Sequence, residues 1–333
     1  MRPRAEHSAV PAPFPLRPLR AAVERIRSTP PGLFLLTTGG LGVYLLVMRL
    51  NGGNRPEQFL LCGLALVLLL GGEASRRFLL GMLPFLLYGL VYDLTHLTQP
   101  LVRYLHVHVV EPYRFDQVLF GIRTAAGVLT PNEIFVRHHW PAVDLVTGLA
   151  YIFFIYWTLL FAVYLGLFRR DEEGRRLLAR YGWVFLLMNL VGFATYYVYP
   201  AAPPWYAADY GFGPANMAVH ASPAAAVRFD ALTGTRYFAE FYGRSADVFG
   251  AIPSLHASYP LLVFLYGRKL GKTWLDVSSF LFFLLVCFSA VYLQHHYVLD
   301  VLIGILYALV AWGVDELLER RRRRAPQAAS GVA

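Results

Sequence analysis

Long apolar segments separated by short polar connections dominate this chain. They lie at roughly residues 32–49, 57–73, 78–94, 141–168, 181–199, 253–267, 274–294 and 297–317. A helix needs about 20 mostly apolar residues to cross a bilayer, and most of these segments reach or approach that length. The pattern predicts about eight transmembrane helices, so the expected fold class is all-α, a polytopic membrane helical bundle.

The composition supports this interpretation. Hydrophobic residues make up 57% of the chain and charged residues only 15%, whereas a soluble globular protein is about 25% charged. The composition therefore argues against a soluble fold. The two cysteines, Cys62 and Cys287, lie inside apolar segments and give no pattern for a disulfide framework. The net charge of +9 does not indicate nucleic acid, because the basic residues form short clusters between apolar segments.

The basic residues also predict the orientation. Counted on alternate sides of the eight segments, 21 of the 30 Lys and Arg residues fall on one side. The positive-inside rule places that side, with both termini, in the cytosol, and the long connections 95–140 and 200–252 outside. The expected division is a cytosolic basic tail over 1–31, a membrane-embedded domain over 32–317 and a second cytosolic basic tail over 318–333.

A first motif, Pro253-Ser254-Leu255-His256, opens the sixth apolar segment. A turn with proline before a helix leaves backbone N–H groups unpaired at the helix start, and such groups favour a phosphate. His256 would add a titratable donor there. Ser254 would contribute either a hydroxyl contact to the phosphate or a simple helix cap.

A second motif places His296 and Asp300 at the start of the last apolar segment. Residues four apart share one helical face, so the carboxylate can hold the imidazole through one nitrogen and leave the other free to attack. An ionisable pair at a membrane helix is costly and indicates function. The neighbouring His295 is expected to face another direction.

The order of the helices brings both motifs to the outer side of the membrane. Such a set suits phosphoryl transfer without a metal. We assign His296 as nucleophile, His256 as general acid and Asp300 as the group that steadies His296. The phosphate oxygens also need positive partners, for which Arg228, Arg236 and Arg244 in the preceding loop are candidates. No metal ligand set is expected.

At these residues the chain resembles the type 2 phosphatidic acid phosphatase superfamily, whose Pro-Ser-x-His motif matches residues 253–256. The superfamily's later Ser-Arg-x5-His-x3-Asp motif matches Ser289, His296 and Asp300, but Ala290 stands at its arginine position. The upstream Lys-x6-Arg-Pro motif is missing. These departures set the chain apart from ordinary phosphatase members.

Residues 200–305, which include Ala202-Pro203-Pro204-Trp205-Tyr206, look like the fungal-type inositol phosphorylceramide synthases. The resemblance implies a six-helix core, no required cofactor, and transfer of phosphoinositol from phosphatidylinositol to ceramide. Membrane lipids would be the partners, and no motif identifies an accessory subunit. Asp93 and Tyr206 are candidate headgroup contacts, although Tyr206 also lies where an interfacial anchor would.

Two alternatives stay open. With water as acceptor, the same residues would form a phosphatase for phosphatidic acid, a prenyl (di)phosphate or a sphingoid phosphate. In a non-enzymatic lipid-binding or transport protein, the motifs would serve only structure.

Overall fold

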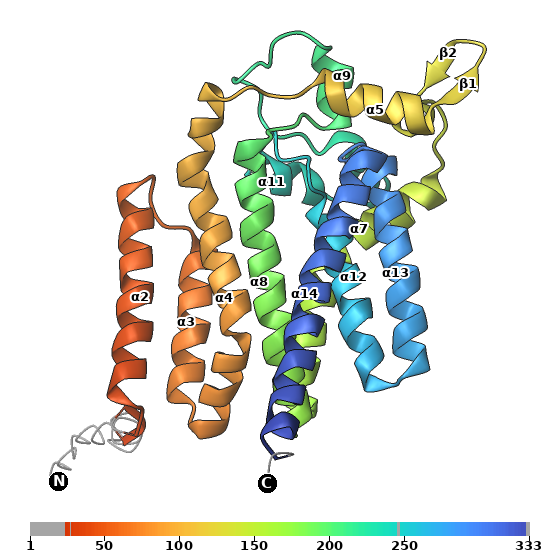
Figure 1. Ribbon diagram of the computed structural model, residues 1–333. Coiled ribbons are helices and arrows are strands. Elements are labelled where there is room, and N and C mark those ends of the chain that lie inside the picture. Colours follow the sequence, from red (N-terminus) through yellow and green to blue (C-terminus); the bar gives the residue numbers. More distant parts are fainter. Residues whose placement is uncertain (1–23, 27, 245–246, 331–333) are drawn as a thin grey trace, which may run out of the picture. The chain divides into compact units, whose positions relative to one another are not determined.

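The computed structural model describes residues 24–26, 28–244 and 247–330 (Figure 1). Most of the expected N-terminal tail and the last three residues lie outside the described residues. The long helices are α2 (Pro31–Leu50), α3 (Pro56–Leu70), α4 (Glu73–Thr98), α7 (Pro141–Phe168), α8 (Glu172–Val198), α12 (Leu255–Gly267), α13 (Thr273–Tyr292) and α14 (Val298–Ser330). Shorter elements are η1 (Gln99–Tyr104), α5 (Val110–Phe120), β1 (Ile122–Thr124), β2 (Gly127–Leu129), α6 (Pro131–Arg137), α9 (Pro204–Tyr210), η2 (Ala224–Ala226), α10 (Val227–Thr233), α11 (Tyr237–Gly243) and η3 (Arg268–Leu270).

Each of the eight predicted apolar segments lies in one of the long helices, which confirms the all-α membrane fold class. Among the described residues, six helices are long and apolar enough to cross a membrane, whereas α3 has 15 residues and α12 only 13. α14 extends past the expected end at residue 317. Its extension is rich in Arg and Ala, which favour helix, so the basic segment continues the same helix.

The chain divides into two compact units, residues 1–80 and 81–333. In the first unit, α2 and α3 pack against each other, and each begins with proline, whose fixed φ suits a first helical residue. The Asn54 side chain donates a hydrogen bond to the carbonyl of Leu45 across the turn between them. The Gln58 side chain accepts one from the Arg55 backbone at the start of α3.

The second unit is a helical bundle with α12 at its centre. α12 packs against α7, α8, α13 and α14, and 11 of its 13 residues are buried. A helix that is apolar on every face belongs in such an interior position. α14 approaches the start of α12 closely at Gly304, where a Cβ atom would lie 2.1 Å from the Ser254 carbonyl oxygen.

A cluster of ion pairs joins helices around Asp315. This residue lies in α14, far from the residue at which that helix begins. Arg180 of α8 lies 2.6 Å from Asp315, and Lys269 of η3 lies 2.6 Å from Glu316. The Tyr266 hydroxyl also donates to Asp315. Basic residues therefore gather away from the end where α12 and α14 begin.

Shorter segments cover the end of the bundle where α12 and α14 begin (Figure 1). α5 packs on α14, α6 on α13 and α10 on α7. Three extended segments meet in the same region, because His108 pairs with Ala201 and Ala201 pairs with Gly250 in parallel bridges. These segments place the residues before α12 against the residues before α14.

Candidate active site

His256 is the second residue of α12 and is partly buried. Its ring stacks on Tyr151 of α7, with ring centroids 4.3 Å apart and planes 12° apart. Phe154, one helical turn further along α7, contacts the imidazole at 4.5 Å. The first turn of α12 thus presents His256 against an aromatic face of α7.

His296 lies in the tight connection between α13 and α14 and is 5% exposed. Gln294 adopts φ +69° there, and the amides of His295 and His296 both donate to the carbonyl of Ala290. The Asn132 side chain, from α6, donates to the His296 carbonyl at 3.0 Å. Hydrogen bonds to the end of α13 and from α6 therefore hold this connection in place.

The contacts of His296 fix where its proton lies. Its Nδ1 is 2.9 Å from the carbonyl oxygen of Ala251, and a carbonyl oxygen can only accept. We therefore assign the proton to Nδ1, which leaves a lone pair on Nε2 of the neutral ring. This Nε2 is 3.1 Å from Nδ1 of His256, so His256 is the donor. The Nε2 lone pair of His296 thus accepts the N–H group of His256, and a substrate phosphate would have to come between them.

Asp300 lies behind His296. Its Oδ2 is 3.5 Å from Nδ1 of His296 and accepts the backbone N–H of Tyr297 at 2.9 Å. The first turn of α14 is held from outside by Asp116 of α5, whose carboxylate accepts the N–H groups of Val298 and Leu299 at 2.8 and 2.9 Å. The structure thus brings together all three residues that the sequence assigns to catalysis.

A cavity of about 330 Å³ opens at the two histidines, a size within the range of small-molecule sites. Its lining is mainly aromatic and includes eight tyrosines, among them Tyr92, Tyr196 and Tyr242. Within the part of the chain that the structure describes, no Lys or Arg side chain lines it. A phosphate bound here would meet hydroxyl, imidazole and backbone N–H groups, and the Asp247 carboxylate also lines the cavity.

His295 also lines this cavity, contrary to the expectation that it faces elsewhere. That expectation assumed helical geometry, but α14 begins only at Val298. The His295 ring lies between Tyr151 and Tyr242, at 5.2 and 4.6 Å and nearly parallel to both. Burial lowers its pKa to about 3, so the ring is neutral, and its Nε2 has no hydrogen-bond partner.

The structure places the three predicted arginines away from the cavity lining. Arg228 pairs with the buried Asp144 of α7 at 2.8 Å, and its guanidinium lies over the Tyr292 ring. It is therefore engaged in holding α10 against α7. Arg236 and Arg244 flank α11 and are exposed. The sequence cannot reveal these positions, because each depends on how the loop folds back.

The remaining candidates also lie outside the lining. Ser254 is fully buried, and its hydroxyl has no partner while its N–H donates to the Asp300 carbonyl. Tyr206 is buried, and its hydroxyl accepts the N–H of Asn216. Asp93 does not line the cavity, whereas its neighbours Tyr92 and His96 do.

Sequence reasoning missed three groups that build the site. The Ala251 carbonyl orients His296, Tyr151 supports two histidine rings, and Asp116 caps the helix that carries Asp300. A backbone carbonyl has no signature in a sequence. A lone Tyr in an apolar segment and a lone Asp in a loop also give no sequence signal for a role in the site.

A family model described as the PAP2 superfamily matches residues 128–314. The phosphoinositol dihydroceramide synthase of Bacteroides thetaiotaomicron is 36% identical over 274 residues, which cover 82% of this chain and 88% of that protein. The inositol phosphorylceramide synthase catalytic subunit aur1 of Schizosaccharomyces pombe is 35% identical over 147 residues, 44% of this chain and 33% of that protein. The inositol phosphorylceramide synthase of Candida albicans is 33% identical over 139 residues, 40% of this chain and 28% of that protein. No solved structure matches the chain.

Proposed function

Because the chain belongs to the PAP2 superfamily and is a multi-pass membrane protein, we propose that it transfers phosphoinositol from phosphatidylinositol to a ceramide. The relative that it matches over most of its length is named for the corresponding reaction with dihydroceramide. The two fungal relatives are named for the synthesis of inositol phosphorylceramide. An enzyme with two lipid substrates needs a site that admits apolar chains, and the aromatic cavity meets this need.

The observation that carries the proposal is the contact between His256 and His296 inside this cavity. In the first step, Nε2 of His296 attacks the phosphorus of phosphatidylinositol. A P–N bond forms and the P–O bond to diacylglycerol breaks. In this step His256 acts as an imidazolium that carries a proton on each ring nitrogen; it gives one proton to the leaving oxygen and becomes a neutral imidazole, so diacylglycerol departs neutral and phosphoinositol stays on His296.

The second step reverses these roles. His256, now without that proton, takes one from a hydroxyl group of the ceramide, and the oxygen attacks the phosphorus. The P–O bond of the product forms as the P–N bond breaks, which restores the free His296 imidazole and the protonated His256. Asp300 and the Ala251 carbonyl hold Nδ1 of His296 throughout, so Nε2 is always the nitrogen that faces the phosphorus.

The developing charge on phosphate needs stabilisation without a lining arginine. The first turn of α12 supplies it in this proposal, because the N-terminal N–H groups of a helix have no partners within the helix and the helix dipole favours an anion. Leu255 and His256 of this turn line the cavity. Tyrosine hydroxyls of the lining add neutral donors.

We also propose that both termini are cytosolic and that the site faces the opposite side of the membrane. The histidines lie where α12 and α14 begin, whereas Arg180, Lys269 and the run Arg320–Arg324 lie toward the other ends of these helices and of α13. Basic residues concentrate on the cytosolic side of membrane proteins.

The test is transfer by the purified full chain in lipid nanodiscs, with inositol-labelled phosphatidylinositol and a fluorescent ceramide. The proposal predicts a product carrying both labels, together with diacylglycerol in equal amount. His256→Ala and His296→Ala should each abolish it. His138→Ala, a change at an exposed histidine outside the cavity, should leave the rate unchanged.

Other outcomes would overturn the proposal. Release of labelled inositol phosphate, with no transfer to ceramide, would make the protein a hydrolase. Full activity of His296→Ala would refute the mechanism, and absence of any turnover by wild-type protein with either acceptor would refute an enzymatic role.

A further inference from the structure

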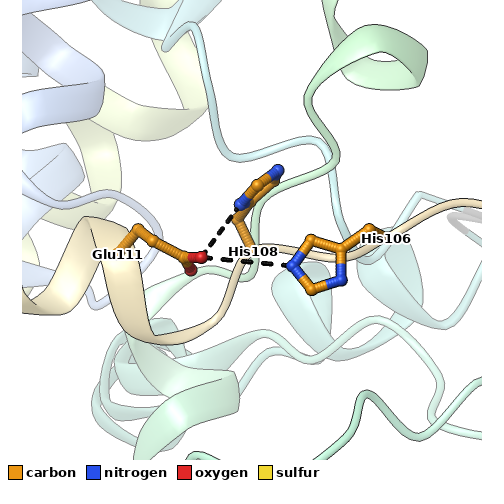
Figure 2. A group of neighbouring side chains, drawn as sticks. All are labelled: His106, His108 and Glu111. Carbon is orange, nitrogen blue, oxygen red and sulfur yellow. Dashed lines mark ion pairs between the residues drawn. The ribbon is translucent and has the colours of Figure 1, made fainter.

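A second group of chemically active side chains lies outside the cavity, before and within the first turn of α5. Figure 2 shows His106, His108 and Glu111 with their side chains turned toward one another. Oε1 of Glu111 lies 3.2 Å from Nδ1 of His108 and 4.0 Å from Nε2 of His106. One potential ligand atom from each residue lies within 4.8 Å of those of the others.

His108 is fixed before any ligand arrives. Its ring stacks on Tyr199, with centroids 3.8 Å apart and planes 6° apart. Its backbone N–H donates to Pro200, and its carbonyl accepts from Ala202. The Nδ1 atom is buried and faces Oε1 of Glu111 at 3.2 Å. The ring nitrogen and the carboxylate oxygen thus face each other at a separation that a bound ion can bridge.

We propose that His106, His108 and Glu111 bind a divalent transition-metal ion of the zinc type. Two imidazoles and one carboxylate suit zinc and its neighbours in the first transition row, whereas calcium and magnesium prefer oxygen ligands alone. At ordinary bond lengths of about 2.0–2.2 Å, two ligands of a tetrahedral zinc ion stand roughly 3.4 Å apart. The His108 and Glu111 atoms are already near that separation.

The His106 side chain must move closer to complete the metal site, and it is free to do so. His106 is 77% exposed, so rotation of its side chain can bring the ring nitrogen closer to Glu111 without disturbing packed neighbours. The fourth position is then open to water, as in zinc sites with three protein ligands. Because one carboxylate only partly neutralises the ion, the bound site is cationic.

The ion would strengthen the backbone that supports His296. His108 pairs with Ala201, the Ala201 carbonyl accepts the N–H of Ala251, and the Ala251 carbonyl contacts Nδ1 of His296. None of the three metal ligands lines the catalytic cavity. The ion therefore stabilises and orders this backbone support, and it does not contact the reacting atoms.

The test uses the full chain without an affinity tag, purified in detergent and treated with a chelator that is then removed. Titration with Zn²⁺ followed by calorimetry should show one ion per chain, and Ca²⁺ should show no binding. His108→Ala and the isosteric Glu111→Gln should each weaken Zn²⁺ binding by about tenfold or more. His138→Ala is the matched control and should bind like wild type.

Hydrogen exchange gives a second readout that does not depend on catalysis. Zn²⁺ should slow exchange of the His108 and Ala202 amides in wild-type protein but not in Glu111→Gln, whose exposed side chain can be replaced without loss of the fold. Failure of wild-type protein to bind Zn²⁺ at micromolar concentration would overturn the proposal. Equal binding by wild type, His108→Ala and Glu111→Gln would overturn it too, since the ion would then be adventitious.

Discussion

The carboxylate of Asp300 lies 3.5 Å from Nδ1 of His296, farther away than the Ala251 carbonyl oxygen at 2.9 Å. The backbone carbonyl alone is therefore able to fix the tautomer of His296. In the proposed mechanism Asp300 adds its negative charge, which would stabilise the imidazole as Nε2 becomes bonded to phosphorus. The mechanism thus divides between two groups the two functions that one aspartate combines in a serine protease triad.

This division predicts the effect of Asp300→Asn. In a triad, the equivalent change costs about 10⁴ in turnover, partly because the histidine takes the wrong tautomer. With the tautomer still held by Ala251, we expect a loss of about 10² in kcat for phosphoinositol transfer. Asp209→Asn, at an exposed position on α9, is the control. A loss of about 10⁴ in a folded Asp300→Asn protein would show that Asp300 sets the tautomer.

Arg228→Ala should lower stability rather than substrate affinity. The change leaves Asp144, whose side chain is 3% exposed, without its cation, and breaking a buried pair costs about 3–5 kcal/mol. We expect an unfolding free energy lower by about 3 kcal/mol and an unchanged KM for phosphatidylinositol, measured by unfolding in detergent and by kinetics below the transition. Arg244→Ala, at an exposed residue, should change stability by less than about 0.5 kcal/mol.

The double variant Asp144→Asn/Arg228→Ala tests whether the unpaired Asp144 charge causes the loss of stability. It removes the unpaired charge, so it should be more stable than Arg228→Ala alone. A large rise in KM for Arg228→Ala, with stability unchanged, would instead mean that Arg228 binds the substrate phosphate.

Tyr151 supports the rings of both His256 and His295. Tyr151→Phe keeps the aromatic face and should retain turnover within about threefold if the face is what matters. Tyr151→Ala opens a cavity beside both rings, so it should lower kcat by about 10² through loss of alignment. Equal activity of the Phe and Ala variants would contradict this role.

Asp116 should make stability depend on pH. Burial, with a smaller contribution from the charge of Asp300, raises the pKa of Asp116 to about 6 from its ordinary 3.8, despite hydrogen bonds from Val298 and Leu299. The folded protein thus holds this proton more tightly than the unfolded chain. The resulting stabilisation is full below pH 3.8 and is lost as pH rises through 6.

Asp116→Asn cannot titrate at this position and provides the comparison. Unfolding midpoints measured from pH 4 to 7 should fall with rising pH more steeply for wild type than for Asp116→Asn. Parallel pH profiles would contradict the raised pKa.

The sequence predicted the helices and the convergence of His256, His296 and Asp300 because both leave local signals. Spanning segments are long apolar runs, and the motifs at His256 and His296 have short fixed spacings. The number of helices between the motifs then decides on which side of the bundle they lie. The contact of His256 with His296 follows from that order.

The loops could not be predicted in the same way. Arg228 pairs with Asp144, 84 residues earlier, and Asp116 caps a helix that begins 182 residues later. Such contacts depend on the folded paths of residues 95–140 and 200–252, which carry no periodic pattern. His295 was misplaced because the sequence does not mark where α14 begins.

The central claim is that His296 carries phosphoinositol between the two lipids. His256→Ala lacks the group that protonates the leaving diacylglycerol and later activates the acceptor, so the intermediate should form slowly and then accumulate during a long incubation with labelled phosphatidylinositol alone. Mass spectrometry under alkaline conditions, which preserve phosphohistidine, should find one inositol phosphate group on the peptide that contains His296, and none in His256→Ala/His296→Ala. A label on another residue, or equal labelling of both proteins, would contradict the account.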